Sequence, residues 1–199
     1  QPDEGFDVES LMATFGRMRL DVENCLKELV DFGVARRLPD RACALATAAD
    51  AMTARGRMAE AIAHFGRALD ELREEPAAGH PALRALAVGG NNLAGALEPR
   101  PALDPAETVA MLTAARAGLR FWRLCGGWLE EERAEYMLAR CQLRAGDAPA
   151  ARASIERCLA LCADHDAPAF ECFFGHAVHA LAARAIGDAA AFAASAWAT

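Results

Sequence analysis

The residue types that could bind a metal ion gather near the end of the sequence. Cys158 and Cys162 lie four residues apart, so they would share one face of a helix, and further thiol and imidazole groups follow them. Thiolates and imidazoles are ligands that zinc and copper prefer. Their spacing is not that of a zinc finger or ribbon, so we favour core packing and keep a metal-binding helical protein as the alternative. The candidate ligands are Cys158, Cys162, His165, Cys172, His176 and His179.

Three arginines form a second group with a shared chemistry. Arg133, Arg140 and Arg144 are separated by seven and four residues, which places them on one face of a single helix. Guanidinium groups bind carboxylates through paired hydrogen bonds, so this basic face predicts a groove for an acidic peptide segment or a chain terminus. The alternative is a solvated helix face whose arginines pair with glutamates of the same helix. Those glutamates are Glu130, Glu131, Glu132 and Glu135, of which the first three are expected to form a solvated N-terminal turn.

The sequence lacks the patterns that usually support catalysis. It has no phosphate-binding glycine loop, no nucleophile elbow and no helix with two histidines and a glutamate in the order of a zinc protease. Gly89 and Gly90 lie within a helical pattern, where glycine favours close contact between helices over phosphate binding. We therefore predict that the protein is not an enzyme and needs no cofactor.

The composition indicates a folded, soluble protein. Of the 199 residues, 54% are hydrophobic and 25% are charged, which is enough to bury a continuous core. The net charge of −7 disfavours a general nucleic-acid binder. No apolar run reaches the roughly 20 residues of a membrane helix, and the polar start lacks the features of a signal peptide. The seven cysteines are scattered through helical patterns, which indicates reduced thiols, and we expect a cytoplasmic location without a membrane partner.

Hydrophobic spacing and turn residues predict helices along the whole chain. Apolar residues recur at intervals of three and four and no stretch alternates as a strand would, so the predicted class is all-α. Gly56, Gly146 and Gly187 are placed to end helices, and Asp104 followed by Pro105 is a typical helix start. The predicted helices cover residues 7–32, 40–55, 58–73, 82–97, 105–124, 128–144, 148–162, 167–186 and 189–199.

Two of the predicted helix pairs carry the same pattern, in which a turn glycine is followed by a small, a large and a second small residue. The residues are Gly56, Ala61, Phe65 and Ala68 in one pair and Gly146, Ala151, Ile155 and Cys158 in the other. This pattern resembles that of the tetratricopeptide-repeat (TPR) family. The resemblance implies a right-handed α-solenoid of antiparallel helical hairpins over residues 40–199, with about three full hairpins and a degraded final one. Residues 1–39 would form an extra N-terminal helix and a linker that pack on the array.

The same resemblance implies a function and a binding face. In the TPR family the first helices of the hairpins line a concave groove, so the chain is expected to be a protein–protein interaction module or scaffold. Asn91 and Tyr136 would supply hydrogen bonds to an acidic peptide or partner protein, and Phe174 is expected to face the groove. Most other aromatic residues, Phe170 and Phe173 among them, are expected in the core. The groove residues are Asp50, Asn91, Arg133, Tyr136, Arg140, Arg144 and Arg184.

Two further interpretations stay open. Residues 26–37 are somewhat similar to the last helix of a winged-helix module. In large bacterial regulators such a module precedes helical repeats. The chain could therefore be the C-terminal repeat fragment of a bacterial regulator. An array that ends in alanine-rich residues could also bury its apolar end against a second copy, which would give a homodimer or another homo-oligomer.

Overall fold

The protein is described by a computed structural model that covers residues 38–72 and 75–197. Within this part of the chain every regular element is a helix and there is no strand, which confirms the predicted all-α class. The helix predicted over residues 7–32 lies outside the described residues. The described helices are α2 (Leu38–Ala54), α3 (Met58–Asp70), α4 (Pro81–Leu97), α5 (Pro105–Cys125), α6 (Trp128–Arg144), α7 (Ala148–Asp164), α8 (Ala169–Ala185) and α9 (Ala189–Trp197).

The predicted turn glycines end their helices through left-handed backbone. Gly56 has a φ of 72° and Gly146 a φ of 82°, a region that residues with a side chain rarely adopt. After α2, the amide of Arg57 donates to the carbonyl of Met52 at 3.0 Å, and Asp147 makes the equivalent bond after α6. Both turns are thus Schellman motifs, which satisfy the last carbonyls of one helix and reverse the chain into the next.

The helix start that the sequence predicts at Asp104 and Pro105 is present, and it forms a capping box. The Asp104 side chain accepts a hydrogen bond of 2.7 Å from the Glu107 amide, and the Glu107 carboxylate accepts one of 3.1 Å from the Asp104 amide. Pro105 occupies the first helical position, where its missing N–H leaves no carbonyl unpaired. By contrast, α8 begins at Ala169, later than predicted, because Asp166 adopts a φ of 50° and Pro168 caps the helix.

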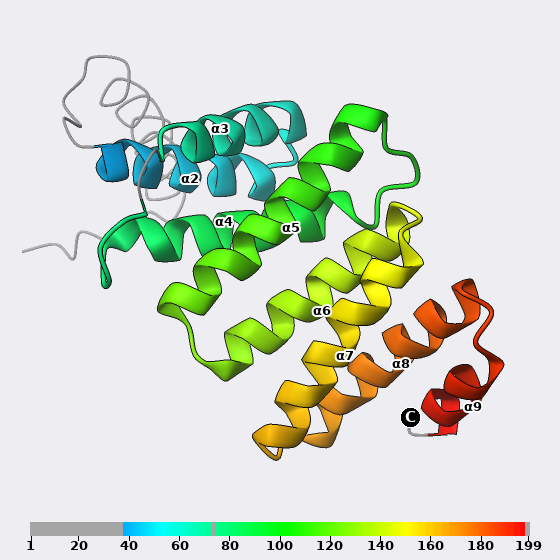
Figure 1. The fold of residues 1–199 in the computed structure, drawn as a ribbon. Coiled ribbons are helices and arrows are strands. Elements are labelled where there is room, and N and C mark those ends of the chain that lie inside the picture. The colour runs from blue at the N-terminus through cyan, green and yellow to red at the C-terminus, as the bar shows by residue number, and fades with distance from the viewer. Residues whose placement is uncertain (1–37, 73–74, 198–199) are drawn as a thin grey trace, which may run out of the picture.

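The helices form an elongated stack of neighbouring hairpins (Figure 1). Each helix packs against the next one along the chain, and α2, α4, α6 and α8 also contact one another in turn. These four helices therefore make one continuous layer. Because α6 touches α4, α5, α7 and α8, it is covered on several faces and offers little free surface.

Small side chains lie where the helices come closest. Ala61 and Ala151 are completely buried, as the repeated pattern predicts, and Phe65 and Ile155 fill the space beside them. One core cluster joins α2 to α6, and a smaller one joins α6, α7 and α8 around Ile155 and Val178. Among the described residues, no helix has both the length and the apolar character that a bilayer-spanning segment requires.

Candidate functional site

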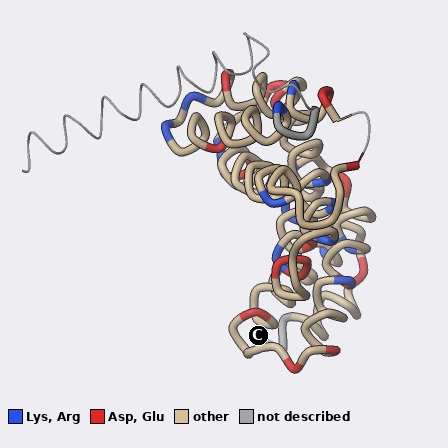
Figure 2. Tube along the Cα trace, turned by 90° about the vertical axis from the view of Figure 1, so that its left-hand side faces the viewer, with Lys and Arg blue, Asp and Glu red and all other residues tan. Residues whose placement is uncertain are grey.

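The row of arginines on α6 is engaged within the chain. Arg133 forms an ion pair with Glu171 of α8, and Arg140 forms one with Glu98 at the end of α4. Arg144 donates hydrogen bonds to the backbone carbonyls of residues 100 and 101, at 2.7 and 3.2 Å. The partners are therefore not the glutamates of α6 that the solvated-face alternative named. Acidic and basic positions are interleaved along the middle of the stack (Figure 2), so an acidic ligand would compete with these internal acceptors.

Three of the predicted groove residues line a single pocket, which we call the α4/α6/α8 pocket. Asn91 comes from α4, Arg133 and Tyr136 come from α6, and the aromatic wall comes from α8. The pocket has a volume of about 290 Å³, which is large enough for a bulky side chain or a small ligand. Its lining residues are Asn91, Glu132, Arg133, Tyr136, Met137, Phe170, Glu171 and Phe174.

The aromatic wall is built from edge-to-face contacts. The ring of Phe174 meets that of Tyr136 at a centroid distance of 6.3 Å and that of Phe170 at 4.8 Å, both with planes 75° apart. Phe174 faces the pocket as predicted. Phe170 and Phe173, however, are 66% and 45% exposed, so the prediction that they lie in the core is wrong. The reason is that they lie in the first turns of α8, where residues 169, 170, 173 and 174 are all exposed.

Asn91 gives the pocket a polar group that lacks a partner. Its side-chain oxygen Oδ1 is buried and accepts no hydrogen bond from any described residue. The Asn91 backbone nitrogen lies 3.0 Å from the position that a Cβ on Gly118 of α5 would take, so α4 and α5 pack closely at this residue. A buried amide oxygen without a donor is costly, so a ligand with an N–H or O–H group would gain this bond on binding.

The remaining predicted groove residues do not line the pocket. Asp50 of α2 accepts a hydrogen bond of 2.8 Å from the Asn92 side chain and so ties α2 to α4. Arg184 is exposed in the last turn of α8. Arg140 lies with its guanidinium carbon 5.7 Å from the centre of the Tyr136 ring, a cation–π contact that orients the tyrosine.

A cluster of two thiols and a carboxylate lies behind this pocket, and we call it the thiol–carboxylate cluster. Cys158 Sγ donates a hydrogen bond of 2.9 Å to Glu132 Oε1. One ligand atom from each of Glu132, Cys158 and Cys162 lies within 4.8 Å of the other two, and all three residues are buried. The expectation that Glu132 belongs to a solvated turn is therefore wrong, because its face of α6 is covered by α7.

Burial shifts the acid–base behaviour of the thiol–carboxylate cluster. Loss of solvent raises the pKa of the Glu132 carboxyl above its ordinary value. It also raises the pKa of the Cys162 thiol to about 12, with the charge of Glu132 adding to the effect, and the pKa of Cys158 is raised further for the same reasons. Both thiols are thus protonated at neutral pH unless a cation displaces the protons.

The other predicted metal ligands lie outside the thiol–carboxylate cluster. Cys172 of α8 contributes to the raised pKa of Cys162 but is not one of the three residues of the thiol–carboxylate cluster. His165 is stacked on Trp128, with the ring centres 4.8 Å apart. His179 Nδ1 lies 2.6 Å from Ser195 Oγ, and the Nδ1 atom of His176 is buried with no described partner. None of the three histidines belongs to the thiol–carboxylate cluster.

Sequence reasoning also missed a second buried carboxylate on α6. Glu135 is fully buried and accepts hydrogen bonds from Arg123 of α5 at 2.6 Å and from Arg157 of α7 at 2.8 Å. Their burial could have been predicted from the helical period, because Glu132 and Glu135 precede the buried Ala139 by seven and four residues. Both glutamates therefore lie on the apolar stripe of α6.

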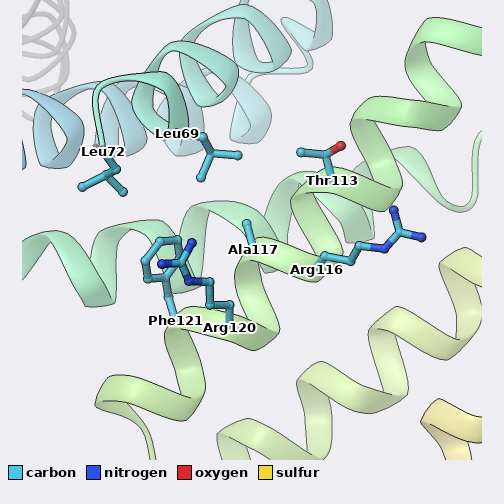
Figure 3. Close-up of a pocket in the computed structure, with 7 residues that line it drawn as sticks. All are labelled: Leu69, Leu72, Thr113, Arg116, Ala117, Arg120 and Phe121. Carbon is cyan, nitrogen blue, oxygen red and sulfur yellow. The ribbon is translucent and has the colours of Figure 1, made fainter. Parts of the chain in front are cut away.

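A second hollow of about 320 Å³ lies between α3 and α5 (Figure 3). Leu69 of α3 and Leu72, which follows the end of that helix, face Ala117 and Phe121 of α5 across it. Arg120, which lies at its side, pairs with Glu75 at 3.1 Å. Among the described residues that line this hollow, none has a buried polar side-chain atom without a hydrogen-bond partner. The α4/α6/α8 pocket differs, because it contains the unpaired Asn91 oxygen.

The α4/α6/α8 pocket and the thiol–carboxylate cluster share Glu132, which lines one and belongs to the other. Searches of protein-family models, curated proteins and solved structures found no match to this chain. The functional conclusion therefore depends on the geometry of these two features.

Proposed function

We propose that the protein is a non-catalytic interaction module that binds a peptide segment of a partner protein in the α4/α6/α8 pocket. On this proposal the hairpins form a TPR-like, right-handed solenoid, and the layer of α2, α4, α6 and α8 carries the binding face. Support for the repeat comes from the buried small residues Ala61 and Ala151 and from the matching turns at Gly56 and Gly146.

The proposal depends on one observation: the pocket combines an apolar wall with a buried polar atom that has no hydrogen-bond partner among the described residues. Exposed aromatic rings form its wall, and the buried Asn91 oxygen has no donor among the described residues. Recognition sites commonly combine an apolar cavity with a few fixed polar groups, because the cavity supplies affinity and the polar groups supply specificity. The expected anchor is an apolar side chain that carries an N–H or O–H group.

An acidic group on the peptide has a defined place on this surface. Arg133 is 56% exposed at its side chain and lies at the edge of the pocket, paired with Glu171. A carboxylate on the peptide can bind Arg133 beside Glu171, because the guanidinium has five N–H donors and its contact with Glu171 is made through Nη2. The acidic-peptide hypothesis therefore applies first to Arg133, since Arg140 and Arg144 bind groups at the α4–α5 connection.

The proposal can be tested without knowing the natural partner. A random peptide library displayed on phage is selected on the immobilised chain, and the enriched peptides are measured by fluorescence anisotropy. We expect Phe174→Ala to weaken binding roughly 5- to 30-fold, as for an interface hot spot. Phe192→Ala is the matched control, because both phenylalanines are 38% exposed and Phe192 lies on α9 outside the pocket.

Two further variants separate the parts of the site. Asn91→Leu keeps the size of the side chain but removes the acceptor, so it should weaken peptides that carry a donor and leave purely apolar peptides unaffected. Arg133→Gln should weaken only peptides with an acidic residue. Equal affinity of all selected peptides for the parent chain and for Phe174→Ala would refute binding in this pocket.

A further inference from the structure

We propose that the thiol–carboxylate cluster is a binding site for a divalent metal ion of the zinc class, with Glu132, Cys158 and Cys162 as ligands and Cys172 as the fourth. The site would join three helices, since Glu132 belongs to α6, the first two cysteines to α7 and Cys172 to α8. This inference is independent of peptide binding.

The spacing of the ligand atoms fits a tetrahedral ion. Zinc–sulfur bonds of about 2.3 Å at tetrahedral angles place two sulfurs roughly 3.8 Å apart. The three ligand atoms of the thiol–carboxylate cluster lie within 4.8 Å of one another, so small side-chain movements suffice to reach that distance. Cys158 and Cys162 lie one helical turn apart on the same face of α7, which sets both sulfurs toward α6 without any change of backbone.

A buried oxygen provides the second, independent sign of a missing ligand. Glu132 is 2% exposed, and its Oε2 atom has no hydrogen-bond partner among the described residues. Only Oε1 is satisfied, by the thiol of Cys158. An ionised carboxylate in this position requires a positive charge, because burial of an unpaired charge is strongly unfavourable. A bound cation would supply that charge and occupy the unsatisfied atom.

Cys172 of α8 is the residue that we assign as the fourth ligand. Cys172 lies three residues before Gly175, whose Cβ position would be 3.7 Å from Cys158 Sγ, so both residues belong to the face of α8 that meets α7. Its thiol makes a long contact of 3.8 Å to the Ala167 carbonyl. A change of the single torsion angle between the Cys172 backbone and its sulfur moves that sulfur without moving the helix. Three thiolates and one carboxylate favour Zn²⁺ or Co²⁺ over Mg²⁺ and Ca²⁺, which prefer oxygen ligands.

The number of protons released when the metal binds follows from the protonation of the thiols in the metal-free site. The thiols are protonated and hydrogen-bonded before the metal enters. Each thiol that becomes a ligand breaks its S–H bond, forms a sulfur–metal bond and releases one proton to solvent, and the carboxylate binds through one oxygen. No electrons are transferred, so neither an oxidant nor a reductant is needed. An ion can approach from the α4/α6/α8 pocket, which Glu132 lines.

Titration of the reduced, metal-free 199-residue chain with Co²⁺ tests the site directly. We expect one Co²⁺ per chain, with a thiolate-to-cobalt charge-transfer band and the strong visible bands of a tetrahedral ion, and displacement of Co²⁺ by Zn²⁺. Cys158→Ala and Cys162→Ala should abolish the charge-transfer band, and Cys172→Ala should reduce its intensity. Cys141→Ala is the matched control, because Cys141 is also a buried thiol but lies in the other core cluster.

Circular dichroism of each variant shows whether it is folded. If an alanine variant does not fold, Glu132→Gln is tested in its place, since this substitution keeps the size of the side chain and an acceptor for Cys158. This variant should bind Co²⁺ at least about tenfold more weakly than the parent chain. The proposal is overturned if the parent chain shows no charge-transfer band under reducing conditions, or if Glu132→Gln or a folded Cys158→Ala binds Co²⁺ as the parent does.

Discussion

Gly90 of α4 and Gly118 of α5 meet backbone to backbone. A Cβ atom placed on Gly90 would lie 2.8 Å from the amide nitrogen of Gly118 and 2.6 Å from the carbonyl oxygen of Ala114. Both atoms belong to the main chain of α5 and cannot move as a flexible side chain would. The close crossing confirms the prediction that glycine within the α4 pattern permits helix contact, and it sets the position of the neighbouring Asn91.

Replacement of Gly90 by alanine should therefore destabilise the fold. We expect Gly90→Ala to lower the free energy of unfolding by about 1–3 kcal/mol, because the added methyl group forces α4 and α5 apart. Gly66→Ala in α3 is the control, since nothing lies within 4 Å of its added Cβ, and helix propensity predicts a gain of about 0.5–1 kcal/mol. Urea unfolding followed by circular dichroism measures both. Equal stability of the two variants would contradict the close crossing.

Local signals were sufficient to predict most of the fold. The capping box at Asp104 and the turns at Gly56 and Gly146 involve residues within six positions of one another, so their outcome is set by the chain near them. The boundaries that shifted had weaker local signals: α2 begins at Leu38, before the expected Asp40, and α7 continues past Cys162 to Asp164.

The candidate site was harder to predict because it is made by helices far apart in sequence. The spacing of Cys158 and Cys162 gave their shared helix face, but it could not show that Glu132 of another helix would meet them. A glutamate in the first turn of a helix is normally solvated. Glu132 comes just after the first turn of α6, on a face that α7 covers, and such coverage depends on packing between helices and not on the local pattern.

Glu135 should be a major contributor to the stability of the α5–α6–α7 packing. Its buried carboxylate joins Arg123 and Arg157, and loss of both arginines would leave the charge without a partner. We expect the double variant Arg123→Ala/Arg157→Ala to lose about 3–5 kcal/mol of stability. Arg120→Ala, which breaks an exposed pair with Glu75, should cost about 1 kcal/mol or less. Thermal unfolding measures both, and a double variant as stable as Arg120→Ala would contradict this role.

The buried Glu132 carboxyl should make stability depend on pH when no metal is present. Its pKa in the folded protein is raised above the ordinary value of 4.5 by burial, so the folded state holds the proton more tightly than the unfolded chain. The stabilisation given by the protonated form is present below pH 4.5 and is lost as the pH rises through the raised pKa. Glutamine stays neutral throughout. The stability of Glu132→Gln relative to the parent should therefore increase over this pH range.

Guanidinium chloride unfolding of both proteins at a series of pH values, with a chelator present, measures this difference. Asp50→Asn is a suitable control, because Asp50 is only partly buried and bonds to the Asn92 side chain. A difference between Glu132→Gln and the parent that stays constant from pH 4 to pH 8 would show that Glu132 is not desolvated in solution.

Metal affinity at the thiol–carboxylate cluster should rise steeply with pH. Cys158 and Cys162 have pKa values raised by burial, the latter to about 12, so both release a proton when a metal binds at neutral pH. Release of two protons raises the affinity by about 100-fold per pH unit, and participation of Cys172 makes the rise steeper. Competition with a chromophoric zinc chelator at several pH values measures the slope, after correction for protonation of the chelator. A slope of less than one proton per ion would mean that the ion binds through the carboxylate and leaves the thiols protonated, contrary to a thiolate site.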